Sequence, residues 1–249
     1  MIVERSMSPE WLSNTWLVAD GPGGKGVLID TGGPPEPILE RIAELELTVT
    51  HALCTHHHHD HVANNALYRD LLKLRVCGHR REAALFGGLD GALDDGEVIS
   101  AGDLRVRVLW IPGHTVGQAA FVVNDERVFT GDTLFRGSVG GTRAAGHATF
   151  AGLKRSIMEV LMKLPPGMEV HPGHMESTRI GEEWEKNPFI RMWRGLDPPG
   201  SSPCVASGKR ATLLLRARDY DGGTKCWVRW DDGGEEDVLP GSLVREPDV

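Results

Sequence analysis

The sequence lacks any continuous apolar run of the roughly 18 residues or more that a membrane-spanning helix requires. Residues 1–10, which include Glu4 and Pro9, also lack the apolar segment of a secretory signal peptide. We therefore expect a cytoplasmic protein that makes no membrane contact.

Cysteine is scarce, and the four cysteines form no C-x-x-C pair. Because cytosolic thiols are kept reduced, we expect no disulfide bonds. Cys54 ends the apolar run 49–54, so we expect a small, buried side chain there. Positive charge is also in deficit, with a formal net charge of −8. Because a negative chain is not attracted to nucleic acid or anionic lipid, we expect neither as a partner.

Strand and helix patterns alternate along most of the chain, which predicts an α/β fold. Residues 14–20 and 27–30 are apolar segments on either side of a Gly-rich turn, and this arrangement predicts a hairpin. Residues 104–109 alternate strictly between apolar and polar side chains, which is typical of a half-buried strand. We expect helices at residues 63–74 and 153–164.

The composition changes at residues 197–203, where Asp, Pro, Gly and Ser predict a linker. We therefore divide the chain into a catalytic domain, residues 1–199, and a small β-rich module, residues 200–249, which weakly resembles SH3 or Tudor barrels. Trp227 and Trp230 should face opposite sides of a strand, one in the module core and the other against the catalytic domain or a partner. We expect the module to pack separately and to mediate assembly or partner contact, with a structural cap as the alternative.

Histidine is the unusual residue: of the 11 in the chain, five lie between His56 and His61, in the pattern H-x-H-x-D-H. Alternate residues of a tight loop can point to one side, so His56 and His58 can reach one metal ion. Asp60 and His61 can reach a second ion after the chain turns into a helix. Neutral imidazole and carboxylate groups suit zinc and related divalent metals. A polar run on a surface loop is the alternative.

Three further ligand-type residues each follow a predicted strand directly. His114 and His174 come after a Pro-Gly pair, and Asp132 comes after a glycine. Sites in layered α/β folds usually lie at strand ends, and an adjacent glycine lets the backbone turn sharply. Together with the histidine segment, these residues predict a two-metal site.

The motifs resemble those of the metallo-β-lactamase superfamily, and specifically its glyoxalase II-like (hydroxyacylglutathione hydrolase-like) branch. The resemblance covers about residues 14–195 and rests on THHHHDH at residues 55–61, FTGDTLFRGSVG at residues 129–140 and PGH at residues 172–174. It implies an αββα sandwich followed here by the small β module. It also implies two Zn²⁺ ions per chain at one edge of the sandwich, with iron or manganese as alternatives.

The resemblance further implies a role for each ligand. The first ion would be held by His56, His58 and His114, the second by Asp60, His61 and His174, and Asp132 would bridge the two. Asp30 matches the family's first motif and would support the metal loop. In the implied mechanism a metal-bridging hydroxide attacks a carbonyl carbon, and Asp60 is the catalytic residue that orients this nucleophile. A thioester suits this chemistry because a thiolate leaves readily.

Substrate contacts are predicted from the loop after the bridging aspartate. Arg136, Arg143 and His147 are the candidates, and solvent exposure is the alternative for each. Glyoxalase II enzymes hold glutathione with a helical C-terminal domain, whereas this chain ends in a β-rich acidic segment, so we expect weak glutathione recognition. His57 and His59 alternate with the ligands and are expected to point away from the metal ions.

Other functions remain open at this point. A persulfide dioxygenase of the same fold would bind one iron ion through His56, His114 and Asp132, although the Pro-Gly-His motif at His174 favours a hydrolase. A binding protein with a degenerate catalytic fold is the third hypothesis, and the complete ligand set argues against it. The expected function is a binuclear metal-dependent hydrolase of small-molecule thioesters or related acyl compounds.

Overall fold

The computed structural model describes residues 1–247 and places the predicted hairpin in a six-stranded sheet. In this hairpin β2 (Asn14–Ala19) pairs antiparallel with β3 (Lys25–Ile29). From β3 onward the strands pair in parallel, because a helix or 3₁₀ turn connects each to the next. The strand order is β1-β2-β3-β4-β5-β6, and the remaining strands are β1 (Ile2–Met7), β4 (Thr48–Cys54), β5 (Arg75–His79) and β6 (Gly91–Leu93).

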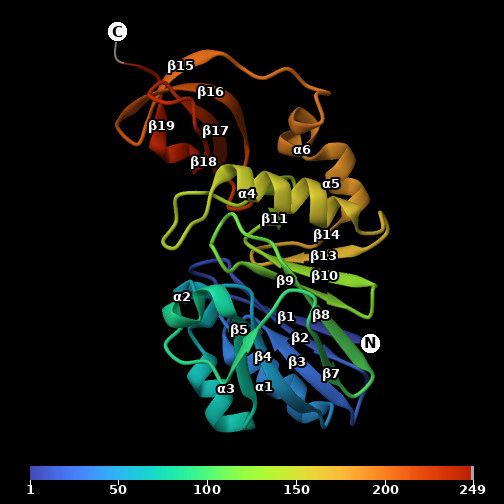
Figure 1. The fold of residues 1–249 in the computed structure, drawn as a ribbon. Helices are drawn as coiled ribbons and strands as arrows, with labels where there is room; N and C mark the ends of the chain where they lie inside the picture. The colour runs from blue at the N-terminus through green and yellow to red at the C-terminus, as the bar shows by residue number, and fades with distance from the viewer. Residues whose placement is uncertain (248–249) are drawn as a thin grey trace.

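A second six-stranded sheet packs against the first, as Figure 1 shows. Its order is β14-β13-β10-β9-β8-β7, with β7 (Val98–Ala101), β8 (Leu104–Trp110), β9 (Ala119–Val123), β10 (Arg127–Gly131), β13 (Glu169–Pro172) and β14 (Thr178–Arg179). The predicted alternation in β8 is confirmed, since Val106 and Val108 are buried and Arg105 is exposed. The two valines pack on Val27 and Leu53 of the first sheet, so one apolar core lies between the sheets.

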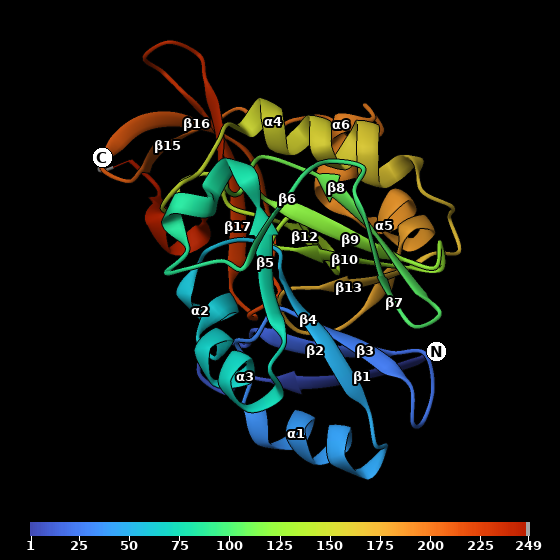
Figure 2. The same ribbon diagram turned by 60° about the horizontal axis from the view of Figure 1, so that its bottom comes forward.

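Helices cover the outer face of each sheet, which confirms the αββα sandwich. The first sheet is covered by α1 (Pro35–Glu44), α2 (His59–Val62) and α3 (Asn65–Leu72). The second is covered by α4 (Phe150–Arg155), α5 (Ile180–Lys186) and α6 (Pro188–Trp193). Figure 2 shows the same layers from another side, with α1 and α3 outside the first sheet.

Two helices differ from their predicted bounds for local reasons. The helix predicted at residues 63–74 corresponds to α3 alone, and the short helix α2, which the sequence did not predict, precedes it. Helix α3 ends because Lys73 adopts a left-handed backbone conformation with φ 54°. The helix predicted at residues 153–164 begins earlier, since the Thr149 hydroxyl accepts a hydrogen bond from the Gly152 amide and caps α4. It continues through a π segment, Ser156–Val160, and a 3₁₀ turn, Leu161–Lys163.

The C-terminal segment forms the predicted β module, an antiparallel sheet of five strands. The order is β18-β17-β16-β15-β19, with β15 (Ser202–Ala206), β16 (Lys209–Arg218), β17 (Thr224–Trp230), β18 (Glu236–Pro240) and β19 (Val244–Arg245). A small core inside the module contains Trp230, Cys226 and Val228. Residues 248 and 249 of the predicted module lie outside the described residues.

The module has a core of its own, but the prediction that it packs separately from the sandwich is wrong. Trp227 belongs to the core of the catalytic sandwich and stacks on Phe150 of α4, with ring centroids 5.5 Å apart. Asp237 of β18 accepts a hydrogen bond from the Thr142 hydroxyl at 2.7 Å, so polar contacts also join the two parts. The opposite orientation of Trp227 and Trp230 is confirmed. Because alternate strand positions point to opposite faces, one face of the module must be buried elsewhere, and here the sandwich buries it.

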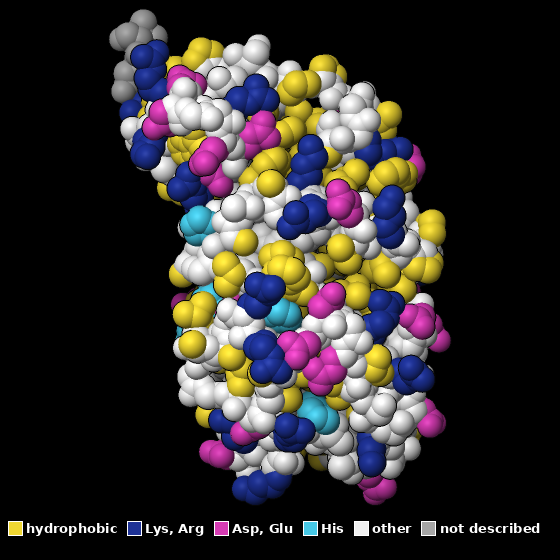
Figure 3. Space-filling view, viewed as in Figure 1, with side chains coloured by type: hydrophobic (Ala, Val, Ile, Leu, Met, Phe, Trp, Pro, Cys, Tyr) yellow, Lys and Arg dark blue, Asp and Glu magenta, His cyan; other side chains and the backbone are white. Residues whose placement is uncertain are grey.

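Cys54 and the other three cysteines are buried and free, as expected. None of the helices within residues 1–247 has the length and apolar character of a bilayer-spanning helix. On the face in Figure 3, Lys and Arg side chains are interspersed with Asp and Glu.

Candidate metal centre

The histidine segment begins where β4 leaves the first sheet. Asp30, which follows the neighbouring strand β3, accepts hydrogen bonds from the amide of Thr55 at 2.7 Å and from its hydroxyl at 2.8 Å. Asp30 adopts φ 54°, a left-handed conformation that Asp tolerates better than most residues, and this turns its carboxylate toward β4. The start of the loop is therefore anchored before the first ligand.

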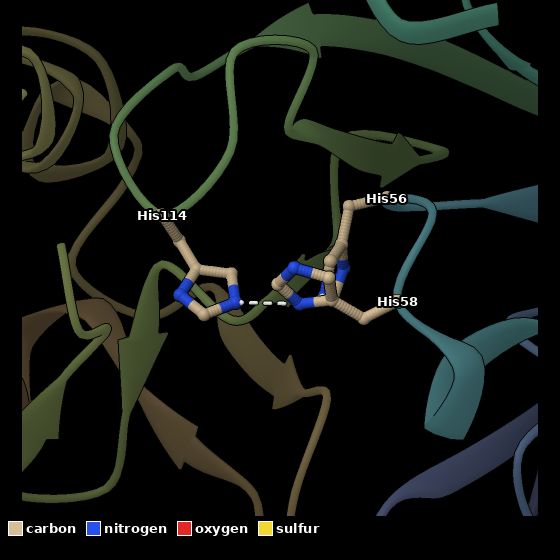
Figure 4. Close-up of side chains that lie close together, drawn as sticks. All are labelled: His56, His58 and His114. Atoms are coloured by element: carbon tan, nitrogen blue, oxygen red, sulfur yellow. Dashed lines mark hydrogen bonds between the residues drawn. The ribbon is translucent and has the colours of Figure 1, made fainter. Parts of the chain in front are cut away.

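Three imidazole rings meet at one side of the loop. The Nε2 atom of His56 lies 2.9 Å from Nδ1 of His58, and Nε2 of His114 lies 3.1 Å from the same atom. Figure 4 shows that the rings point toward one another, with His56 and His58 from the segment before α2 and His114 from the loop after β8. These nitrogen atoms are close enough together to be ligands of one metal ion.

A second group of donors lies beside the first. The Oδ2 atom of Asp60 lies 3.4 Å from Nε2 of His61 and 3.5 Å from Nε2 of His174. The two Nε2 atoms lie 3.3 Å apart. Asp60 and His61 come from α2, whereas His174 follows β13, so opposite halves of the sandwich contribute to this group.

Asp132 lies between the two groups. Its Oδ2 atom is 3.7 Å from Nε2 of His114 and 3.3 Å from Nε2 of His174, and its Oδ1 atom is 3.3 Å from Nε2 of His61. Among the residues that the structure describes, the buried Oδ1 atom has no hydrogen-bond partner. An unpartnered buried carboxylate oxygen facing several imidazoles is the arrangement expected of a metal ligand.

The outward nitrogen of each imidazole has its own partner, which determines the tautomer. The Nδ1 atoms of His114 and His174 lie 2.9 Å from the Gly141 carbonyl and 3.0 Å from the Trp11 carbonyl. Nδ1 of His61 lies 2.9 Å from Oδ2 of Asp30. Since a carbonyl or carboxylate only accepts, each Nδ1 carries a hydrogen, and Nε2 is the atom of each ring that faces the centre and can bind a metal ion.

His58 is oriented the other way. Its Nε2 atom donates to the Ala145 carbonyl at 2.7 Å, which leaves Nδ1 as the inward donor. The inward nitrogen atoms of these four rings, each fixed by a partner on the outer side, fit divalent metal ions at this place.

Burial keeps two of the ligands neutral. It lowers the pKa of His114 to about 4 and the pKa of His56 well below its ordinary value. For Asp132 burial is the largest influence and would raise the pKa, but the surrounding imidazoles, His174 and His61 foremost, hold it well below the usual range. Neutral imidazole and ionised carboxylate are the forms that bind zinc-type metals.

The intervening histidines point elsewhere, as expected. Nδ1 of His57 lies 3.2 Å from the buried carboxylate of Glu82, and the His59 ring packs edge-on against Trp11. Glu82 also accepts a hydrogen bond from the Gly117 amide at 3.2 Å and so supports the loop that carries His114. Sequence reasoning missed Glu82, because nothing near it in the chain indicates that role.

The three predicted substrate residues are divided between two cavities. Arg136 lines a cavity of about 450 Å³ that includes the ligand His174. Arg143 and His147 line a different cavity of about 690 Å³, which contains none of the seven ligands. Arg143 also pairs with Asp237 at 2.7 Å, so of the three only Arg136 shares a cavity with a candidate metal ligand.

Comparison with known proteins agrees with this geometry. Residues 8–174 match the family model of the metallo-beta-lactamase superfamily. The chain is 40% identical over 164 residues to a hydroxyacylglutathione hydrolase of Mesorhizobium japonicum, covering 64% of this chain and 60% of that protein. It is 31% identical over 183 residues to the hydroxyacylglutathione hydrolase GloC of Haemophilus influenzae, covering 66% of this chain and 86% of that protein.

A solved structure is also similar. The crystal structure of ETHE1 from Myxococcus xanthus has 31% sequence identity and a TM-score of 0.68, covering 80% of this chain and 92% of that one. The family model spans most of the sandwich and ends at the last ligand, His174. The chain therefore belongs to the metallo-beta-lactamase superfamily, within its glyoxalase II-like branch.

Proposed function

We propose that the chain is a binuclear zinc-dependent hydrolase of small-molecule thioesters and related acyl compounds. The observation that carries the proposal is the position of Asp132, whose two oxygen atoms face both donor groups. One metal ion would need only one of these groups. Two groups that share a carboxylate are suited to a pair of ions.

Two bound divalent ions in such a site would polarise a substrate carbonyl and lower the pKa of water to about 7. The chain itself adds the carboxylate of Asp60. The Asp60 side chain is 27% exposed, whereas the Asp132 side chain is 10% exposed, so Asp60 can exchange protons with solvent. Asp60 would orient the attacking water and hold its proton at Oδ2, while the buried ligands keep their positions.

A cysteine nucleophile is not supported. Burial raises the pKa of all four thiols, so the reactive thiolate is disfavoured at each of them. Direct attack by activated water agrees better with these environments. The similarity to two hydroxyacylglutathione hydrolases supports a thioester as the substrate.

The second candidate is a mononuclear iron persulfide dioxygenase that uses His56, His114 and Asp132. The similarity to ETHE1 of Myxococcus xanthus favours it. The convergence of Asp60, His61 and His174 favours the hydrolase, because a mononuclear site leaves that second group unused.

Metal analysis combined with two activity assays tests the proposal. The purified protein is reconstituted separately with zinc and with iron, and each form is assayed for thioester cleavage and for persulfide-dependent oxygen consumption. We expect two equivalents of zinc and thioester cleavage without oxygen consumption. One equivalent of iron with oxygen consumption would establish the dioxygenase instead.

A further inference from the structure

The cavity that contains His174 is formed jointly by the sandwich and the β module. The sandwich contributes Arg136, which lies between the short strands β11 (Leu134–Phe135) and β12 (Ser138–Val139). The module contributes Arg218, the last residue of β16, and Tyr220. The cavity, about 450 Å³ in volume, thus has a metal ligand at one side and module residues at the other.

Tyr220 is held as a rigid wall of this cavity. Its ring lies parallel to the His174 imidazole, with centroids 4.7 Å apart and an interplanar angle of 17°. It also contacts the ring of Phe135 with centroids 4.5 Å apart.

The cavity is lined by two arginines and two acidic residues, and in the described part of the chain only the acidic residues have ion-pair partners. Its two acidic residues are neutralised by partners, since Asp219 pairs with Lys225 at 2.9 Å and Glu176 pairs with Arg5 at 3.0 Å. Arg136 and Arg218 are exposed, and within residues 1–247 neither makes an ion pair. Two unpaired guanidinium groups at one cavity are suited to a carboxylate or phosphate, which they bind through several N–H donors.

We propose that the β module completes the substrate site, and that Arg136 and Arg218 bind an anionic group of the thioester while Tyr220 forms the wall between that group and His174. The inference rests on the proposed function and adds a substrate class, thioesters that carry a carboxylate or phosphate. Because one arginine comes from each part of the chain, neither part can form this site alone.

A matched series of substrates locates the anionic group. Acetyl-N-acetylcysteamine is neutral, and succinyl-N-acetylcysteamine carries a carboxylate on its acyl group. In acetyl-glutathione the thiol component, glutathione, carries carboxylates, and in acetyl-coenzyme A the thiol component carries phosphates. We expect at least one anionic substrate to have a KM about ten-fold or more below that of the neutral one, since a factor of ten needs only one favourable charged contact.

Variants connect this preference to the two arginines. In the zinc-loaded R136Q/R218Q protein, KM for the preferred anionic substrate should rise about ten-fold or more, with kcat and the neutral substrate unchanged within about two-fold. The control is Arg210→Gln, which removes an exposed arginine about 25 Å away at the other end of β16 and should change nothing.

Calorimetric titration of the protein with the anionic product measures binding affinity, which does not depend on turnover. Equal KM values for charged and neutral thioesters, or a double variant identical to Arg210→Gln, would overturn the proposed cavity while the hydrolase remains. If no thioester is cleaved but binding of glutathione, succinate or coenzyme A still requires both arginines, the proposed function fails and the anion site stands.

Discussion

The ring of Tyr220 stacks on the imidazole of His174, with centroids 4.7 Å apart and planes inclined by 17°. The first residue belongs to the β module and the second is a candidate metal ligand that follows β13. On its outward side the same imidazole bonds to the Trp11 carbonyl at 3.0 Å. His174 is therefore held by two segments that are far apart in the sequence, and the module is in contact with the metal centre.

Removal of the Tyr220 ring should weaken metal binding at the second donor group. Tyr220→Ala deletes a stacking contact, and such contacts contribute about 0.5–1.5 kcal/mol, which corresponds to about 2–10-fold in affinity. Tyr220→Phe keeps the ring and should bind metal like the unmodified protein. Competition with a chromophoric chelator measures both. Equal affinities for the alanine and unmodified proteins would mean that the stacking does not orient His174.

Substitution of two neighbouring histidines should affect the metal content differently. His58→Ala removes an inward nitrogen and should reduce metal content by about one equivalent and abolish turnover. His57→Ala removes a ring that faces Glu82 and should keep the full metal content. Elemental analysis after gel filtration distinguishes the two variants. A normal metal content in His58→Ala would contradict the assignment of the first donor group.

Asp30→Asn tests the support beneath His61. Asparagine also tolerates the left-handed backbone at this position, so the loop should keep its shape. The Asp30 carboxylate accepts hydrogen bonds from the amide of Thr55 through one oxygen atom and from Nδ1 of His61 through the other. An asparagine amide can accept only at its single oxygen atom, because its nitrogen atom is a donor, so one of these bonds is lost. We expect about 10–100-fold weaker metal affinity with little loss of stability. Isothermal titration with zinc measures the affinity, and an unchanged value would show that His61 needs no such partner.

Trp227→Ala should destabilise the whole protein and not the module alone. The indole is 7% exposed and lies in the sandwich core against α4, so its removal should cost about 3–5 kcal/mol of unfolding free energy. Leu243→Ala is the control, because this side chain is 48% exposed and its loss should cost less than about 0.5 kcal/mol. Urea denaturation followed by circular dichroism compares them. A separate early transition in Trp227→Ala, with the main transition unchanged, would mean that the module unfolds independently.

The sequence by itself determined the features that depend on local patterns. The alternation of Val106 and Val108 predicted one buried face of β8, since strand side chains point alternately to opposite faces. The H-x-H-x-D-H spacing singled out the ligand segment because its members are adjacent in the chain. Its order relative to His114, Asp132 and His174 then indicated the family, whose fold the structure confirms.

Only the tertiary structure decided how distant segments combine. Tyr220 and Arg218 stand in no recognisable motif, and their place beside His174 exists because Trp227 docks the module on α4. Arg143 follows Asp132 in sequence, yet it pairs with Asp237 of the module and lines a cavity that contains none of the candidate ligands. Contacts of this kind depend on the direction in which a packed surface faces. That direction results from burial of apolar area over the whole fold and not from any short pattern of residues.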